Sequence, residues 1–400
     1  MQSTKKAAGN LVFLCAAIYF ISYMTRINYG TVISEMVTGT GLAKSVLSTA
    51  LTGSAVTYGI GQLISGFLGD RIQPKKLVAM GLITTAAMNL LLPLCGDPMQ
   101  MTAVWCVNGF AQAMMWPPLT KLLATQLTVP EYNHGIVRVS WGSSFGTIFL
   151  YLSAPLLIMV GSWKWVFVFS AVFAVMGLLL WWKNCPTIAL SAPAGKQKAS
   201  GGGQVFLPLL LLVMAAIVLQ GILRDGVTTW MPSYISETYN LSNAISILTG
   251  VLLPIFSVLC NNLTGHLYEK KLKNPLLSAG VIFGVGAAAA LLLSLFSSQS
   301  AAVSIFLSAL LTGCMHGVNL LLVCMMPPLL AKSGKVSTIS GILNFSAYIG
   351  AALSAYVFPL VAESSGWTAT IRLWLAAAVA GTLICLLSLP LWKRISGKKG

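Results

Sequence analysis

The chain has 400 residues, of which 56% are hydrophobic and only 8% are charged. Because soluble domains carry about a quarter charged residues, this balance excludes an ordinary soluble protein and predicts a membrane protein. The formal net charge is +16, from 24 Lys and Arg against 8 Asp and Glu. Nucleic-acid binding would need a soluble basic domain, which the sequence lacks, whereas basic residues in membrane proteins usually mark cytoplasmic loops. We therefore expect a lipid bilayer and no nucleic acid as partner.

Apolar stretches long enough to cross a hydrocarbon core ~30 Å thick, at about 20 residues each, predict roughly twelve helices. Their predicted centres are, in chain order, Tyr19, Tyr58, Ala86, Ala113, Gly146, Val172, Gln220, Pro254, Gly284, Gly313, Ile349 and Val379. No small-residue cleavage site follows the first stretch, so we expect a spanning helix there rather than a removed signal peptide.

Basic residues gather in alternate loops, and this alternation predicts how the chain is oriented in the membrane. By the positive-inside rule this pattern predicts that both termini lie in the cytoplasm, as in a multi-pass protein of the bacterial inner membrane. Residues 183–204 are rich in Gly, Ser, Ala and Lys and cannot form a core, so they predict a flexible cytoplasmic linker. The predicted division is a six-helix bundle at 1–182 and a second at 205–400.

The two predicted bundles share a repeated pattern. A Gly-x-x-x-acid-base motif follows the second predicted helix and recurs after the eighth. Such a tight turn with an acid-base cluster can hold neighbouring helices together. An arginine precedes the first motif by 40 residues and the second by 41. The motif residues are Gly66, Asp70, Arg71 and Lys75 in the first bundle and Gly265, Glu269 and Lys270 in the second.

Those two arginines, Arg26 and Arg224, lie deep inside apolar stretches. A charge there costs at least a few kcal/mol and normally faces a water-filled cavity. The alternative is that each side chain snorkels to a helix end or pairs with a local acid. Asp225 is adjacent to Arg224, but neighbouring helix positions point about 100° apart, so we expect the pair not to face each other. Since arginine binds phosphate or carboxylate through a planar fork, the pair predicts a site for a small anion.

Further polar residues share helix faces with these arginines. Tyr19 and Tyr23 lie on the face of Arg26. The other candidates for the substrate site are Tyr58 and Gln62, Asn344 and Tyr348, His316 and Asn319. Each tyrosine taken singly is as compatible with an interfacial aromatic belt or with packing as with a substrate contact, and only the stripe shared with Arg26 favours the substrate site. His316 could be a packing residue, a ligand contact or a proton carrier.

The eight cysteines show no metal-binding spacing, and the sequence lacks the motifs of hydrolases and P-loop ATPases. We therefore expect neither an enzyme nor a cofactor or metal, and we expect ion or solute gradients to drive any transport. Proline pairs at 117–118 and 327–328 predict helix kinks.

The chain resembles the organophosphate:phosphate antiporters of the major facilitator superfamily. The resemblance rests on three motifs: Tyr19-x-x-x-Tyr23-x-x-Arg26, the run from Asn108 to Gln112 leading to Trp116, and Arg224-x-Gly226-Val227-x-x-Trp230-x-Pro232-x-Tyr234. It implies a twelve-helix fold of two pseudo-symmetric six-helix bundles and rocker-switch exchange of a phosphorylated metabolite for phosphate. Arg26 and Arg224 would bind the phosphate.

The same resemblance places other residues in the cavity and shows where this chain departs from the family. The implied cavity residues are Tyr19, Tyr23, Tyr58, Trp116 and Tyr348, and Gln62, Trp141 and Ser144 are further candidates for the substrate site. Ile27, Gln62 and Ser144 stand where glycerol-3-phosphate transporters carry basic residues, and Asp225 stands where an aromatic is expected. A carrier whose empty site holds two unneutralised arginines would reorient slowly between the two sides of the membrane, which predicts strict exchange. We expect this carrier to be a monomer.

Two other functions stay open. The first is proton-coupled symport of an organic or sugar acid, with Asp225 or His316 carrying the proton, because Tyr23, Arg26 and Asn28 also match the first helix of acid transporters. The second is a membrane receptor that binds a sugar phosphate without net transport.

Overall fold

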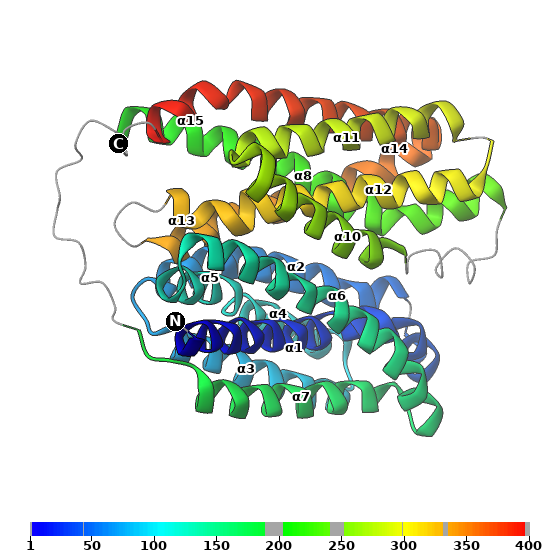
Figure 1. Ribbon diagram of the computed structural model, residues 1–400. Helices are drawn as coiled ribbons and strands as arrows, with labels where there is room; N and C mark the ends of the chain where they lie inside the picture. The colour runs from blue at the N-terminus through cyan, green and yellow to red at the C-terminus, as the bar shows by residue number, and fades with distance from the viewer. Residues whose placement is uncertain are drawn as a thin grey trace. The chain divides into compact units, whose positions relative to one another are not determined.

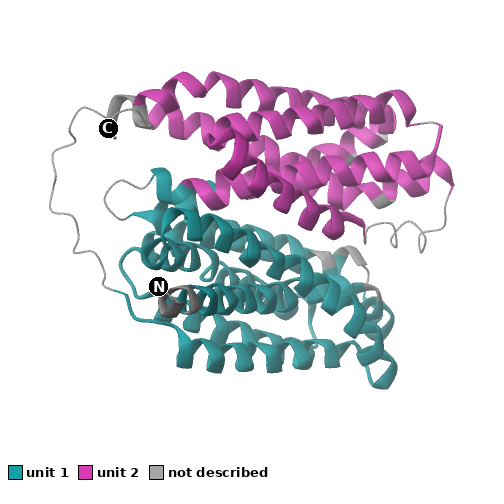
Figure 2. Cartoon of the chain, viewed as in Figure 1, with its two compact units in different colours: residues 1–193, 327–345 teal, residues 194–326, 346–400 magenta. Residues whose placement is uncertain are grey.

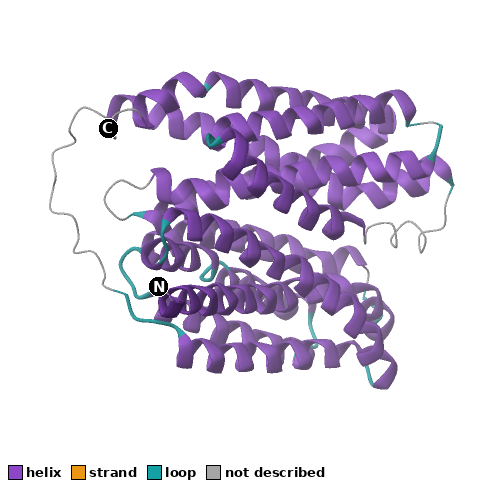
Figure 3. Ribbon diagram, viewed as in Figure 1, coloured by secondary structure: helices purple, strands orange, loops and turns teal. Residues whose placement is uncertain are grey.

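The computed structural model describes residues 2–42, 44–188, 203–240, 252–297, 299–330 and 335–396. Every regular element within these ranges is a helix, and none of the residues described is in a strand (Figure 3). This confirms the predicted all-α class. It also fits a membrane environment, because helices satisfy their backbone hydrogen bonds internally.

The first compact unit comprises residues 1–193 and 327–345, drawn teal in Figure 2. It contains most of α13 (Met326–Leu330) and the start of α14 (Val336–Leu387). Its other elements are α1 (Gln2–Thr40), α2 (Lys44–Gly69), α3 (Pro74–Leu91), the short 3-10 helix η1 (Leu92–Leu94), α4 (Pro98–Gln112), α5 (Trp116–Gln126), α6 (Val129–Val160) and α7 (Trp163–Asn184).

The second compact unit comprises residues 194–326 and 346–400. It contains the remainder of α14, which Gly366 breaks into two helices with a φ of 78°. Its other elements, labelled with the rest in Figure 1 where there is room, are α8 (Gly203–Tyr239), α10 (Leu252–Leu267), the π-helix η2 (Tyr268–Leu272), α11 (Pro275–Phe296), α12 (Ala301–Asn319), the π-helix η3 (Leu320–Met325) and α15 (Leu389–Ser396).

Eleven of the twelve predicted centres lie within helices, and the twelfth, Ala113, lies in the turn between α4 and α5. Within the described residues, nine helical stretches are long and apolar enough to span a membrane. Three predicted spans are not among the nine. They are α2, which is rich in Ser, Thr and Gly, the broken α4 and α5, and α10, which the structure describes only from Leu252. Most of the predicted linker, 189–202, lies outside the described residues, and its boundaries stay a prediction.

Helix α1 is fixed on two sides within the first unit. Its backbone contacts α6 closely, because a Cβ on Gly142 would lie 2.5 Å from the Ala16 carbonyl oxygen. On another side, buried polar residues bind α1 to α3 and α4, as when Asn28 donates to Asn89 at 2.7 Å. The Tyr19, Tyr23 and Arg26 stripe lies between these two faces.

Helix α8 is held in a similar way within the second unit. A Cβ on Gly221 would lie 2.1 Å from the carbonyl oxygen of Ala347 in α14, so the two backbones touch. Gln220 is fully buried and donates to the Met315 carbonyl oxygen of α12 at 3.1 Å. These contacts fix the rotation of α8 one turn before Arg224.

Two arginine sites in the membrane helices

Aromatic rings surround Arg26 in the first unit. The guanidinium carbon lies 4.2 Å from the ring centre of Tyr23 and 4.7 Å from that of Tyr58. Tyr19 contacts Tyr23, with ring centres 5.1 Å apart, and Trp116, with ring centres 4.7 Å apart. The predicted aromatic residues of α1, α2 and α5 therefore gather at this arginine. A ring face stabilises a cation by about 0.5–1 kcal/mol but does not neutralise its charge.

Other predicted residues of the first unit carry buried polar atoms without a hydrogen-bond partner. Among the residues described, both amide atoms of Gln62 and the indole N–H groups of Trp116 and Trp141 are in this condition. Ser144 and Asn344 are also buried. Since buried polar groups in native proteins are nearly always hydrogen-bonded, these unpaired groups are candidates to bind a substrate.

Arg224 in the second unit is paired with its neighbour. Its Nε donates to one carboxylate oxygen of Asp225 at 2.9 Å, and its Nη2 donates to the other at 2.7 Å. The expectation that the two residues would not face each other is wrong. The Cβ directions do diverge, but the long arginine side chain folds back and lays its fork against the carboxylate. The pair is largely buried, with side chains 12% and 34% exposed.

Asn319 and His316 of α12 complete this cluster. The side-chain oxygen of Asn319 accepts a hydrogen bond from Arg224 Nη1 at 3.0 Å. His316 is half-buried and interacts electrostatically with both Arg224 and Asp225. Asn319 is the last residue before the π-helix η3, which precedes the proline pair at 327–328. A π-helix thus directly precedes the short helix that contains the proline pair, and such irregularities are frequent at functional sites. Tyr348 is half-buried on α14 of the same unit.

The first copy of the Gly-x-x-x-acid-base motif binds the start of α14. The Asp70 carboxylate accepts hydrogen bonds from the backbone N–H groups of Ser337, at 3.1 Å, and Thr338, at 2.8 Å. It also pairs with Lys121 at 3.6 Å. Gly66 permits the close approach, because a Cβ there would lie 2.8 Å from the Ser337 carbonyl oxygen. An anion at a helix N-terminus is stabilising, so this motif fastens α2 to α14.

The two basic residues of the first motif lie near aromatic rings. The Arg71 guanidinium lies 3.9 Å from the Phe67 ring centre, and the Lys75 ammonium lies 5.3 Å from the Trp182 ring centre. In the second copy, Gly265 is buried near the end of α10, while Glu269 and Lys270 lie in the π-helix η2. The two copies therefore differ in backbone, although their sequences follow one pattern.

Sequence reasoning missed the polar layer behind Arg26. Gln112 accepts a hydrogen bond from Ser22 at 2.6 Å and donates to Thr25 at 2.7 Å, while Asn108 donates to the Thr25 carbonyl oxygen at 3.1 Å. The spacing of Ser22, Thr25 and Asn28 at three-residue intervals marks a polar stripe and could have predicted it. Because Asn28 is fully buried against Asn89, its role is to position α1.

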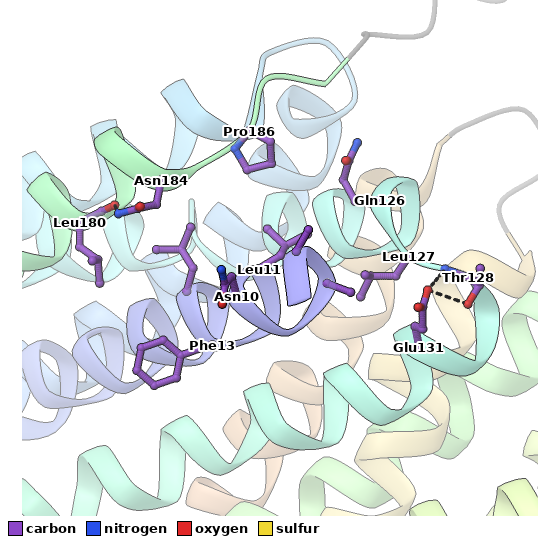
Figure 4. A pocket seen from close by; sticks show the side chains of 13 residues that line it. Asn10, Leu11, Phe13, Gln126, Leu127, Thr128, Glu131, Leu180, Asn184 and Pro186 are labelled. Carbon is purple, nitrogen blue, oxygen red and sulfur yellow. Dashed lines mark hydrogen bonds between the residues drawn. The ribbon is translucent and has the colours of Figure 1, made fainter. Parts of the chain in front are cut away.

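An open groove of about 840 Å³ lies at one end of the first unit, between the start of α1 and the neighbouring ends of α5, α6 and α7 (Figure 4). None of its lining residues is a predicted site residue. Glu131 in its wall accepts hydrogen bonds from the hydroxyl and the backbone N–H of Thr128, so it caps α6. The lining residues are Ala7, Ala8, Asn10, Leu11, Phe13, Leu14, Gln126, Leu127, Thr128, Glu131, Leu180, Asn184 and Pro186.

Long apolar helices, two of which contain Arg26 and Arg224, are typical of a multi-pass membrane transporter. The profile of the Major Facilitator Superfamily matches residues 15–355, so the chain belongs to this superfamily and is not an enzyme. It is similar to the membrane sensor protein UhpC of Salmonella typhimurium, with 22% identity over 93% of this chain and 88% of the relative. It is equally similar to the glycerol-3-phosphate transporter of Bacillus subtilis, with 22% identity over 93% and 90%.

A solved structure supports the fold. The proton:xylose symporter XylE, bound to 6-bromo-6-deoxy-D-glucose, superimposes with a TM-score of 0.77 over 98% of this chain and 96% of the other. The two sequences are only 12% identical, so this likeness concerns the major facilitator fold alone.

Proposed function

We propose that the protein exchanges a small phosphorylated metabolite for inorganic phosphate across the bacterial inner membrane, with both termini in the cytoplasm. The carrier acts as a monomer and alternates access by a rocker-switch movement. Arg26 and Arg224 bind the phosphate group. The observation that carries the proposal is that each of the two units supplies one arginine, which lies within a long apolar helix and contacts candidate site residues.

The chemistry of Arg26 favours an anionic substrate. Its guanidinium lies against the ring faces of Tyr23 and Tyr58, which stabilise a positive charge. An anion with several oxygens can bind a guanidinium through two parallel hydrogen bonds. The unpaired amide of Gln62, one turn after Tyr58, can bind the uncharged part of the metabolite. Similarity to a glycerol-3-phosphate transporter supports phosphate as the anionic group.

Transport into proteoliposomes tests this function. Vesicles loaded with inorganic phosphate should take up radiolabelled glycerol 3-phosphate or glucose 6-phosphate several times faster than phosphate-free vesicles. Equal rates with and without internal phosphate would contradict exchange. Binding without flux, in protein that is inserted correctly, would indicate a receptor instead.

A second candidate is proton-coupled symport of an organic acid, which the Arg224 cluster favours. Asp225 and His316 are titratable and both interact with this arginine. Symport predicts that an imposed pH gradient drives uptake of a sugar acid such as gluconate and that a protonophore abolishes it. Asp225→Asn should remove the dependence on the gradient. Uptake that persists unchanged in the presence of the protonophore would exclude this candidate.

A further inference from the structure

We propose that Asp225 is a built-in substitute for the substrate anion. It occupies the binding edge of Arg224 in the empty carrier, lowers the affinity for external anions, and lets the empty carrier reorient. This inference rests on the proposed function, because it concerns what Arg224 does when no substrate is bound.

The geometry of the pair is that of a bound ligand. Both carboxylate oxygens of Asp225 accept from the Nε and Nη2 edge of the guanidinium, at 2.9 and 2.7 Å. Parallel two-point contacts of this kind are how arginine binds carboxylate and phosphate. Asn319 of α12 accepts a hydrogen bond from Arg224 Nη1 at 3.0 Å, and this bond fixes the plane of the guanidinium. A substrate that takes the same edge must first displace Asp225.

Asp225 competes with the substrate anion for Arg224 within the same molecule. Asp225 is adjacent to Arg224 on α8, so its carboxylate is always within reach of the fork, at a high effective concentration. Tight backbone contact with α14 at Gly221 keeps this part of α8 in place. Asp225 nevertheless stays 34% exposed, so the carboxylate can swing into water when an anion replaces it.

The pairing changes what is expected of the empty carrier. Strict exchange was predicted because two unneutralised arginines would make the empty state slow to reorient. That premise is wrong for Arg224, whose charge Asp225 balances in the structure. The empty carrier buries less net charge than the premise assumed, so reorientation without substrate is easier. We therefore expect net phosphate transport to accompany exchange, at a lower rate.

Radiolabelled inorganic phosphate tests the inference in Asp225→Asn, a nearly isosteric change. Phosphate binding to the purified variant should tighten about five- to tenfold, because the internal competitor is gone. The ratio of phosphate-phosphate exchange to net uptake into phosphate-free vesicles should rise by a similar factor. An unchanged ratio or weaker binding would overturn the inference.

The matched control is Glu237→Gln. It removes one negative charge from the same helix, and the Glu237 carboxylate accepts a hydrogen bond from the Trp367 indole at 2.7 Å rather than from an arginine. Its binding and flux ratio should equal those of the unmodified protein. A change as large as that of Asp225→Asn would show a general charge effect and overturn the inference.

Arginine labelling gives a second measurement that needs no substrate. Phenylglyoxal modifies accessible guanidiniums, and peptide mass spectrometry compares Arg224 with Arg26 in the same molecule. Labelling of Arg224 relative to Arg26 should rise several-fold in Asp225→Asn, and an equal ratio in both proteins would overturn the inference.

Two further variants separate this inference from the proposed function. If Arg26→Gln and Arg224→Gln retain phosphate exchange, the proposed function fails. If both lose exchange while Asp225→Asn behaves like the unmodified protein, only the present inference fails.

Discussion

Arg26 and Arg224 occupy matching positions in the two repeats, yet their surroundings differ in kind. The rings of Tyr23 and Tyr58 contact Arg26 from α1 and α2. A carboxylate and an amide contact Arg224 from α8 and α12. Ring faces leave a positive charge in place, whereas a carboxylate balances it. The comparison teaches that equivalent residues in a repeat can have different surroundings. Under the proposed function, Arg26 would attract the anion, and Arg224 would bind it only when Asp225 leaves.

Removal of either charge should have the largest effect. Each two-point contact with phosphate comprises charge-assisted hydrogen bonds of about 1.5–3 kcal/mol, so Arg26→Gln should weaken phosphate binding about 100-fold and Arg224→Gln about 30-fold. If Asp225 already competes at Arg224, the loss should be larger for Arg26→Gln. Isothermal titration with phosphate measures both. Arg138→Gln, which removes an exposed arginine of α6, is the control and should bind normally. Equal losses at the two sites would break the comparison.

The backbone contacts that position each arginine can be disturbed separately. Gly221→Ala places a Cβ 2.1 Å from the Ala347 carbonyl oxygen, and Gly142→Ala places one 2.5 Å from that of Ala16. Overpacking of this kind costs about 1–3 kcal/mol, so the melting temperature should fall by about 5 °C in each variant. Thermal unfolding of purified protein checks this. Gly284→Ala meets no atom within 4 Å and should melt like the unmodified protein. An unchanged melting temperature for Gly221→Ala would contradict the close α8 to α14 contact.

Replacement by lysine sharpens the contrast, because it keeps the charge and removes the planar fork. Arg224→Lys should weaken phosphate binding about tenfold, since the two-point contact is lost. Arg26→Lys should weaken it only about threefold, because an ammonium group still interacts with the faces of Tyr23 and Tyr58. Phosphate titration of the two variants, side by side, measures the difference. A larger loss for Arg26→Lys would indicate that the fork matters more in the first repeat.

The smallest effect on phosphate binding is expected from changes to the aromatic rings around Arg26. Tyr58→Leu removes a ring face from Arg26 and should weaken phosphate binding about two- to fivefold, in line with cation-π energies of about 0.5–1 kcal/mol. Tyr58→Phe keeps the ring and is the matched control. If Tyr58→Phe loses as much affinity as Tyr58→Leu, then the hydroxyl, and not the ring face, is the important group.

The sequence by itself determined the helical class, the approximate positions of the helices and the placement of both arginines within long apolar helices. It also predicted the aromatic stripe, because Tyr19, Tyr23 and Arg26 follow the helical period along one segment. Hydropathy and helical periodicity are local properties, so one segment carries enough information to read them. Membership of a transporter family follows from the same local patterns, which the superfamily profile matches over most of the chain.

Only the tertiary structure decided which groups contact each arginine. The Arg224 to Asp225 pair depends on how a flexible side chain folds back, and the direction of its Cβ bond gave the wrong answer. Asn319 contacts Arg224 although the two residues are 95 positions apart in the sequence. Asp70 and Thr338 are 268 positions apart and are also hydrogen-bonded. Such contacts arise when helices pack and buried polar groups find partners. They are therefore set by the assembled helices and not by the pattern within any one of them.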